Sequence, residues 1–508
     1  MAVKTFAAID VGSFEIEMGI YEISQRGGIR LIDSVNHVIG LGSDTYTTGE
    51  ISSELTEELI SILTDFRQIM QTYRCTAVRA VATSAMREAA NRAVVLDQIA
   101  TRTGLKVEVI SNAEQRMLSF KAIASRGQKF DDLIQDGTAV IETTFGSTQI
   151  TIFDRGQMVG TQNVRLGALR LRDMIAEVNS ARDERELVMG EMVDHELEIY
   201  KRIHLGNRKI KSMIALGEPI RVIFSRLMRM DGRDPAADDI TDQKTLLRYL
   251  QYVTERTDSQ LEDSLGVTMA IAGVLFPAAV VFRRALDMTG AEAVWCPGTR
   301  LIDGIAAEHA YNHRMIRHPH DFERDVISAV REIATHYGEG TPHRDYSVRN
   351  TLKIFDALKK SQGFTDRDRL LLETATLLHH CGRFINMGHP NLSSCDIIHE
   401  TEIIGLSEEE HEMIAQILKN DDEHFDWSGN SMQVAKFTAI IHLSDALDRS
   451  AKLKGGEYTI RLDEQRHLNI STKYTGDMTL ERLSFEKNKR LFIGIFGIEP
   501  IFRQRRKH

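Results

Sequence analysis

The 508-residue chain has few cysteines and no long apolar run, and both absences restrict its class. Cys75, Cys296, Cys381 and Cys395 lack the close spacing of structural metal sites and the density of disulfide-rich secreted proteins. An uninterrupted apolar run of about 18 residues, enough to cross a bilayer, is absent. The first residues also lack the apolar stretch of a signal peptide. These features predict a cytoplasmic protein.

Positive charge is also in deficit. Lysine and arginine number 63 against 73 aspartate and glutamate residues, for a formal net charge of -10. An acidic chain is not a general binder of nucleic acids or of membrane surfaces, so neither partner is expected. With 42% hydrophobic and 27% charged residues, the composition is globular and excludes a disordered chain, collagen and a simple coiled coil. The length predicts several domains.

The apolar pattern predicts an α/β unit at the start of the chain. Residues 4–10, 15–21 and 29–32 have strand character, whereas apolar positions between 52 and 74 follow a helical repeat. Strand-like and helical segments then alternate to about residue 125. Three strands followed by such an alternation predict a sheet with helices packed on its faces.

A second segment begins like the first. In each, an apolar strand ends in a carboxylate and is followed by a Gly-Ser turn and another strand. The two sequences are Asp10-Val-Gly-Ser13 and Glu142-Thr-Thr-Phe-Gly-Ser-Thr148, and a hairpin is predicted over 149–153 and 157–161. The repeat is short and does not establish a duplication by itself.

Gly-Ser turns after buried strands are suited to binding phosphate. Glycine lets backbone N–H groups approach the anion, and hydroxyls add donors. Carboxylates at the strand ends, here Asp10 and Glu142, can hold Mg²⁺ through water. An ordinary tight hairpin is the alternative for either turn.

The stretch Ala82-Thr-Ser-Ala-Met-Arg-Glu-Ala-Ala-Asn91 carries a more specific signal. It places the hydroxyls of Thr83 and Ser84 at a strand end and Arg87 one helical turn later. A guanidinium and two hydroxyls in this arrangement suit a bound phosphate oxyanion.

These motifs resemble those of the exopolyphosphatase/guanosine pentaphosphate phosphohydrolase family. The decapeptide is similar to the family's Ala-Thr-Ser-Ala-(Leu/Met)-Arg-Glu-Ala-x-Asn signature, and Ala8-Ile-Asp-Val-Gly-Ser13 to its Ala-Ile-Asp-x-Gly-Ser start. The segment Thr299-Arg-Leu-Ile-Asp-Gly304 resembles the family's Leu-Arg-Glu-Gly segment. Order and spacing agree along most of the chain.

The resemblance implies an α/β, actin-like (ribonuclease H-like) core of two lobes with the site in the cleft between them. An all-α HD-like domain and a small α+β C-terminal domain would follow the core. The expected domains are lobe I at 1–125, lobe II at 126–310, the helical domain at 311–455 and the C-terminal domain at 456–508.

The implied activity is release of terminal phosphate from inorganic polyphosphate or guanosine pentaphosphate with Mg²⁺, by a protein that forms a homodimer. Asp10 and Glu142 would place the metal. The expected phosphate-binding residues are Gly12, Ser13, Thr83, Ser84, Arg87, Gly146, Ser147 and Thr148.

The position of the family's catalytic glutamate is altered. The family pattern resembles Ile-Ser-Gly-x-Glu-Glu-Ala, and this chain has Ile110-Ser-Asn-Ala-Glu-Gln-Arg116, so Gln115 stands where the second glutamate activates water. A glutamine can orient a water molecule but cannot take its proton. Glu114 lies about 100° around a helix from Gln115. We expect Gln115 to orient the water, with help from Glu114 or Gln149.

A catalytically silent protein that binds polyphosphate or guanosine tetraphosphate is the alternative. It is favoured by Gln115, by Gln149 in place of a glutamate, and by Thr144 and Phe145 in place of two glycines of the second phosphate loop. A kinase is less favoured, because the chain lacks a convincing adenosine-binding glycine pair.

The helical region offers a separate enzyme hypothesis. An HD phosphohydrolase binds metal through a distal histidine, an adjacent His-Asp pair and a later aspartate. His343, His379 and Asp445 match three of these positions, but His380 stands in place of the paired aspartate. A histidine at the end of an apolar helix is more often a packed core side chain than a ligand.

Overall fold

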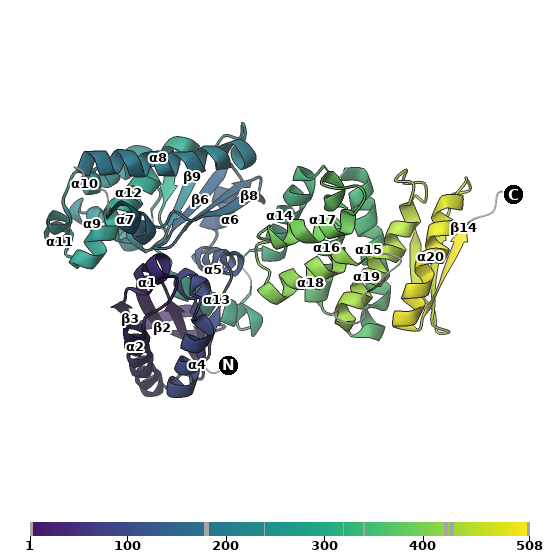
Figure 1. Cartoon of the computed structure of the whole chain (residues 1–508), viewed down its shortest axis with the longest axis horizontal. Helices are drawn as coiled ribbons and strands as arrows, with labels where there is room; N and C mark the ends of the chain where they lie inside the picture. Colours follow the sequence, from purple (N-terminus) through teal and green to yellow (C-terminus); the bar gives the residue numbers. More distant parts are fainter. Residues whose placement is uncertain are drawn as a thin grey trace. The chain divides into compact units, whose positions relative to one another are not determined.

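The computed structural model describes residues 4–176, 182–237, 239–317, 320–338, 341–420, 425 and 431–504. The chain divides into two compact units, Met1–Phe322 and Glu323–His508, called here the N-terminal and C-terminal units (Figure 1).

Lobe I of the N-terminal unit is a five-stranded sheet of order β3-β2-β1-β4-β5. The first three strands are antiparallel neighbours, and β4 and β5 continue in parallel with β1. The strands are β1 (Lys4–Val11), β2 (Glu15–Ser24), β3 (Gly28–Val38), β4 (Ala77–Ala82) and β5 (Val107–Val109). The helices are α1 (Leu41–Thr48), α2 (Ser53–Thr72), α3 (Ser84–Glu88), α4 (Arg92–Thr103) and α5 (Asn112–Ala124).

Helices cover both faces of this sheet because successive side chains of β1 point to opposite sides. Ala7 and Ile9 pack in one apolar cluster with side chains of α2 and α4. Phe6 and Ala8 pack in a second cluster with side chains of α5 and of α13 (Leu301–Asn312). The α/β unit predicted from the apolar pattern is therefore confirmed.

Lobe II repeats this topology. Its sheet has the order β10-β11-β9-β6-β7-β8, in which β6, β7 and β8 are antiparallel neighbours and β9 and β11 run parallel to β6. The strands are β6 (Thr138–Thr143), β7 (Thr148–Asp154), β8 (Gln157–Val164), β9 (Ser212–Leu216), β10 (Thr241–Asp242) and β11 (Ala293–Trp295). Because β1 and β6 hold equivalent positions, the short repeat in the sequence marks a structural duplication.

The helices of lobe II bury the largest apolar cluster of the N-terminal unit against this sheet. They are α6 (Lys129–Ile134), α7 (Ala168–Ala176), α8 (Arg182–Tyr200) with a π-helical turn at Lys201–Leu205, α9 (Glu218–Met230), a 3₁₀ turn at Pro235–Ala237, α10 (Gln243–Thr254), α11 (Asp258–Leu265) and α12 (Met269–Thr289). Among the described residues, α12 alone is long and apolar enough to cross a membrane, and 67% of its most apolar window is buried inside the protein.

Helix α13 returns from lobe II to pack on lobe I through a close contact at Gly304. A Cβ atom added there would lie 2.1 Å from the backbone oxygen of Leu118 in α5. The glycine therefore sets how closely α13 approaches α5, which carries Gln115. The predicted domain boundary at residue 310 falls within this helix.

We predict that Gly304→Ala lowers the free energy of unfolding by about 1–3 kcal/mol, because backbone atoms must move to relieve the clash. Gly273→Ala in α12 is the matched control, since its added Cβ would approach no described atom closer than 3.6 Å. Thermal unfolding followed by circular dichroism compares the two. An unchanged melting temperature for Gly304→Ala would contradict the packing argument.

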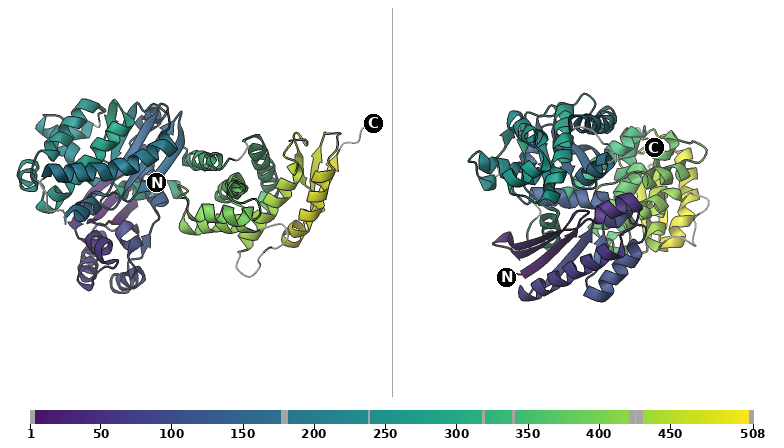
Figure 2. Two further views of the ribbon diagram at one scale, coloured as in Figure 1. Left: turned by 45° about the horizontal axis from the view of Figure 1, so that its top comes forward. Right: turned by 60° about the vertical axis from the view of Figure 1, so that its left-hand side comes forward.

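The C-terminal unit is a helical array with a small sheet at its end. The helices are α14 (Phe322–His336), α15 (Thr341–Gln362), α16 (Asp366–Leu378), α17 (Pro390–His399), α18 (Glu408–Lys419) and α19 (Met432–Asp445), with 3₁₀ turns at Cys381–Phe384 and Ala446–Asp448. The sheet has the order β12 (Thr459–Leu462), β13 (His467–Thr472), β14 (Glu499–Gln504), and α20 (Thr479–Phe496) connects β13 to β14. Helix α20 lies beside β14 and contacts α19, so helices and sheet belong to one compact unit (Figure 2).

Candidate functional site

The carboxyl ends of β1 and β6 meet at a cleft between lobes I and II. Its cavity has a volume of about 90 Å³, which is room for several water molecules. Both predicted metal-placing residues, Asp10 and Glu142, line this cavity. The predicted site residues that also line it are Gly12, Ser13, Thr83, Ser84, Gln115 and Gly146.

Several carboxylates lie close together in the cleft, where burial disfavours their charged form. Burial, together with repulsion from Glu17 and Glu142, raises the pKa of Asp10 to about 8. Burial and the charges of Glu218 and Glu17 raise the pKa of Glu15 to about 8. Burial raises the pKa of Glu142 to about 7, although the hydrogen bond from Ser119 opposes the shift. Burial in the cleft thus disfavours the charged form of these acids.

The donor set fits a hard divalent cation such as Mg²⁺. The Oδ1 atom of Asp10 is buried and has no hydrogen-bond partner among the described residues, and the same holds for Oε1 of Glu15. Buried carboxylate oxygens without partners are costly unless a cation or a donor satisfies them. Mg²⁺ prefers oxygen ligands and keeps several waters, so one or two carboxylates suffice to hold it.

Three hydroxyl groups form a cluster on the lobe I side of the cleft. Ser13 Oγ lies 2.8 Å from both Tyr46 Oη and Ser84 Oγ, and the backbone N–H of Ala85 donates to Ser13 Oγ at 3.2 Å. The Tyr46 hydroxyl donates to Ser84 Oγ at 2.9 Å. Gly146 of lobe II packs on this cluster, because a Cβ added to it would lie 2.1 Å from Tyr46 Oη. The two predicted phosphate-binding turns therefore face each other.

Arg87 was predicted to bind phosphate, but its guanidinium is engaged elsewhere. It donates to the backbone oxygen of Ile110 and to Oδ1 of Asn112, at the start of α5. Arg87 is not among the described residues that line the cavity. In this conformation the arginine positions α5.

The side chains of the neighbouring residues Glu114 and Gln115 have different surroundings. Glu114 forms a capping box with Ser111: its carboxylate accepts from the Ser111 N–H at 3.0 Å, and its own N–H donates to Ser111 Oγ at 3.1 Å. Gln115 is buried and lines the cleft. The helical register therefore turns the glutamine toward the cleft and commits the glutamate to the helix end, so Glu114 is not placed to orient the water.

Gln149, Ser147 and Thr148 lie outside the described lining of the cavity. Gln149 is buried and accepts a hydrogen bond from Nε of Arg116 at 3.0 Å. The Thr148 hydroxyl donates to the backbone oxygen of Leu166 at 2.6 Å. The side chains of Gln149 and Thr148 therefore hold the second loop in place, and none of the three residues lines the cavity.

Sequence reasoning missed several residues of the cleft. Glu15, Glu218 and Arg300 line the cavity, and Arg300 forms an ion pair with Glu17. Glu218 begins α9 and pairs with Arg221 one turn later. Arg300 lies in the Thr299–Gly304 motif, which could have indicated it as a residue of the site. Glu15 and Glu218 have no spacing that marks them.

Phe145 joins the two lobes at the edge of the cleft. Its ring lies 4.7 Å from that of Phe14, centroid to centroid, and both pack with Leu169. Arg170 reinforces the contact: its guanidinium stacks 3.8 Å from the Tyr46 ring centroid and pairs with Glu88. Phe145 thus packs against lobe I while it also borders the cavity.

A duplicated α/β fold with its site at the ends of equivalent strands defines the class of actin-like, two-lobed proteins. The sequence matches the model of the Ppx/GppA phosphatase family over residues 20–313 and that of Ppx/GppA phosphatase domain III over residues 327–488. The chain therefore belongs to the Ppx/GppA phosphatase family, and the resemblance stated from its motifs is confirmed.

Curated relatives match at low identity. Exopolyphosphatase 2 of Mycobacterium tuberculosis is 29% identical over 185 residues, which cover 34% of this chain and 55% of the relative. The match thus spans about half the length of that relative. A guanosine-5'-triphosphate,3'-diphosphate pyrophosphatase of Photobacterium profundum is 20% identical over 428 residues, covering 82% of this chain and 80% of the relative.

Solved structures share the fold. An exopolyphosphatase from Cytophaga hutchinsonii has a TM-score of 0.53 at 19% identity and covers 59% of this chain and 96% of its own. A Ppx/GppA family member from Aquifex aeolicus has a TM-score of 0.51 at 18% identity and covers 61% and 99%. These likenesses confirm the predicted fold class.

Proposed function

We propose that the protein is a cytoplasmic phosphohydrolase that releases terminal phosphate from inorganic polyphosphate or guanosine pentaphosphate with Mg²⁺. The observation that carries the proposal is the cleft itself. Asp10, with an unpartnered buried oxygen, and Glu142 stand at the ends of equivalent strands beside two facing Gly-Ser turns. Two relatives named for these two substrates support both substrate classes.

The acidic cleft makes the cation necessary for an anionic substrate. Asp10, Glu15, Glu17, Glu142 and Glu218 all line the cavity. Arg300 opposes them, but it is already paired with Glu17. Asp10 and Glu142 would hold Mg²⁺, which would neutralise charge on the phosphates and supply them with a binding partner.

The chain's own groups would then position the reaction. The hydroxyls of Ser13, Thr83 and Ser84 and the backbone N–H groups of the two turns would bind phosphate oxygens. Gln115 would orient a water molecule for in-line attack on the terminal phosphorus, in which a new P–O bond forms as the bond to the bridging oxygen breaks and the shortened substrate leaves. The water's proton would pass to a phosphate oxygen. Because Gln115 cannot accept the water's proton, we expect slow turnover.

A catalytically silent binder of polyphosphate or a guanosine tetraphosphate is the second candidate. The observation that favours it is the arrangement at the start of α5, where Gln115 faces the cleft and Glu114 is committed to the capping box. In this reading the ligand would report its presence through closure of the lobes, which Phe14 and Phe145 already hold in contact.

Phosphate release from long-chain polyphosphate, with and without Mg²⁺, tests the proposal. We expect slow, Mg²⁺-dependent release that falls at least about 100-fold in Asp10→Asn, because the metal loses a ligand. Asp65→Asn, which removes an exposed carboxylate from α2, is the matched control and should retain the native rate. Tight binding of polyphosphate without release would favour the silent binder, and neither binding nor release of either substrate would overturn both.

A further inference from the structure

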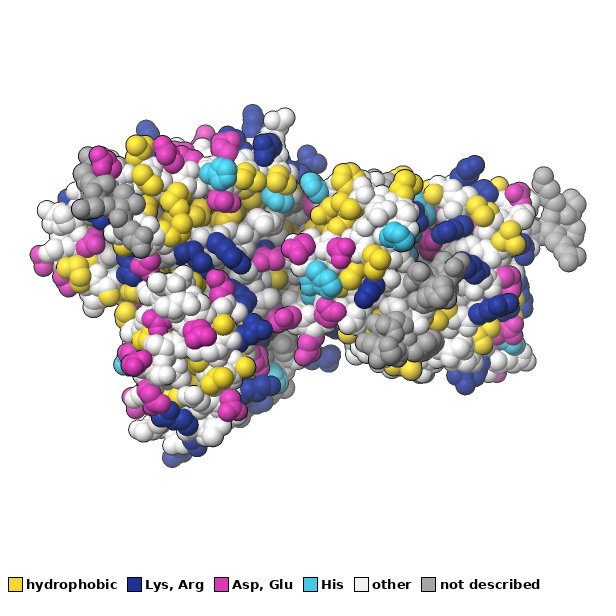
Figure 3. Space-filling view, in the orientation of Figure 1, with side chains coloured by type: hydrophobic (Ala, Val, Ile, Leu, Met, Phe, Trp, Pro, Cys, Tyr) yellow, Lys and Arg dark blue, Asp and Glu magenta, His cyan; other side chains and the backbone are white. Residues whose placement is uncertain are grey.

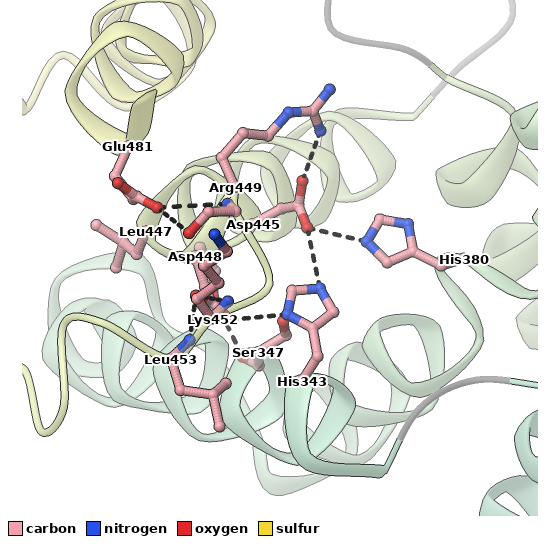
Figure 4. Close-up of polar contacts among 12 residues, drawn as sticks. His343, Ser347, His380, Asp445, Leu447, Asp448, Arg449, Lys452, Leu453 and Glu481 are labelled. Atoms are coloured by element: carbon pink, nitrogen blue, oxygen red, sulfur yellow. Dashed lines mark hydrogen bonds and ion pairs between the residues drawn. The ribbon is translucent and has the colours of Figure 1, made fainter. Parts of the chain in front are cut away.

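The C-terminal unit contains a second cluster of ligand-type side chains, formed where several elements meet. His343 lies in the first turn of α15, His380 follows α16, and Asp445 ends α19 (Figure 4). One nitrogen or oxygen atom from each of the three lies within 4.8 Å of the others. Of the two adjacent histidines, His380 rather than His379 joins this cluster.

The distances suit a single ion. Nε2 of His380 lies 2.9 Å from Oδ1 of Asp445, and Nε2 of His343 lies 4.0 Å from the same oxygen. Ligands bound tetrahedrally to Zn²⁺ at about 2.0–2.1 Å are about 3.4 Å from one another. These two separations bracket this value, and the third, between the two histidines, is within 4.8 Å.

Asp448 fixes His343 in the orientation that a ligand needs. Its Oδ2 atom lies 2.8 Å from Nδ1 of His343, and its Oδ1 atom accepts the backbone N–H groups of Lys452 and Leu453 (Figure 4). The carboxylate is buried, with 1% of its side chain exposed. Metal-bound histidines in general donate their second ring N–H to such a carboxylate.

Arg449 lies on the other oxygen of Asp445, 3.2 Å from Oδ2. The Oδ1 atom of Asp445 therefore faces the two histidines, His343 and His380.

A small cavity adjoins the cluster. It borders His380 and Asp445, has a volume of about 10 Å³, and is lined by Ser347 and Thr351 among others. The hydroxyls of Ser347 and Thr351 are buried and have no hydrogen-bond partner among the described residues. The space suits about one water molecule. The cavity therefore offers room for a water molecule beside two residues of the cluster, His380 and Asp445.

We propose that His343, His380 and Asp445 bind one divalent transition-metal ion of the Zn²⁺ type, with Asp448 as a positioning residue and a water as the further ligand. Two imidazoles and one carboxylate favour Zn²⁺ and its neighbours over Mg²⁺, which prefers oxygen ligands alone. This site lies in the C-terminal unit and is independent of the carboxylate cleft.

Metal stoichiometry of the full-length protein tests the assignment. After removal of metals by a chelator, the protein is dialysed against micromolar Zn²⁺ and its metal content is measured. We expect His380→Ala and Asp445→Asn each to lose one equivalent relative to the native protein. His399→Ala is the matched control, because His399 also pairs with a carboxylate, Glu412, in the same unit. The control should keep the native stoichiometry.

Co²⁺ supplies a second readout, which the native protein alone can give. The native protein loaded with Co²⁺ should show the intense visible absorption of a four- or five-coordinate site, and His343→Gln should weaken or shift it. Unchanged stoichiometry in His380→Ala and Asp445→Asn would overturn the proposal. So would a native protein that binds no Zn²⁺ and shows no such absorption.

Discussion

Gln115→Glu is expected to raise the rate of phosphate release by about 10²- to 10⁴-fold, the usual contribution of a positioned general base. Gln115 is buried, lines the cleft and sits in the first turn of α5, whose start is held by the Ser111–Glu114 capping box. A carboxylate at this place can take the proton of the attacking water. The measurement is phosphate release from polyphosphate and from guanosine pentaphosphate with Mg²⁺.

The gain in rate from Gln115→Glu is expected to depend on pH. A further carboxylate among Asp10, Glu15 and Glu142 is expected to have a raised pKa, so the gain should increase as pH rises above 7. Gln68→Glu, the same change on the exposed face of α2, is the matched control and should leave the rate unchanged. A native rate equal to that of Gln115→Glu would show that another group already serves as the base.

In the absence of divalent cations, the stability of the N-terminal unit is expected to fall as pH rises from about 4 to about 8. Asp10 has a folded-state pKa of about 8 against an ordinary value of 3.8, so the folded protein binds the extra proton across this window. Losing that proton destabilises the fold. At 1.36 kcal/mol per pKa unit, the contribution of Asp10 alone has an upper bound of about 6 kcal/mol.

Asp10→Asn removes this penalty, because an amide carries no charge at any of these pH values. The variant is therefore expected to melt several degrees higher than the native protein at pH 8.5 without Mg²⁺, and to gain less from added Mg²⁺. Melting curves at pH 5 and pH 8.5, with and without Mg²⁺, measure both effects, and Asp65→Asn should follow the native protein. An equal Mg²⁺ response in Asp10→Asn and the native protein would contradict a metal at this carboxylate.

The distribution of charge was harder to predict from the sequence than the fold. On the face shown in Figure 3, acidic and basic side chains of the described residues are interspersed, as an overall charge of -10 in a long chain allows. The concentration of negative charge lies instead in the cleft, where β1, β2, β6 and α9 each contribute acids. A total charge cannot reveal such a local excess.

Local sequence patterns were sufficient for much of the fold. The strand predicted over residues 149–153 is β7 (Thr148–Asp154), and the helix predicted between 52 and 74 is α2 (Ser53–Thr72). The spacing of apolar residues and the turn residues carry this information, because both depend on residues close together in the sequence. The expected help from Glu114 was not predictable in this way, because its carboxylate is used by the capping box at the start of α5.

Several roles depended on contacts between distant residues. Arg87 has the sequence context of a phosphate ligand, but the nearby start of α5 offers its guanidinium two acceptors. Tyr46 joins Ser13 and Ser84 although no motif marks it. His380, rather than His379, meets His343 and Asp445, because the chain turns at the end of α16.

The sequence by itself therefore determined the family and much of the order of the elements. These depend on residue identity and spacing along the chain. Only the tertiary structure decided which carboxylates share the cleft, which loop residues reach it, and which histidine joins the cluster in the C-terminal unit. The physical reason is that burial, charge repulsion and hydrogen-bond partners arise between elements that the chain brings together from far apart.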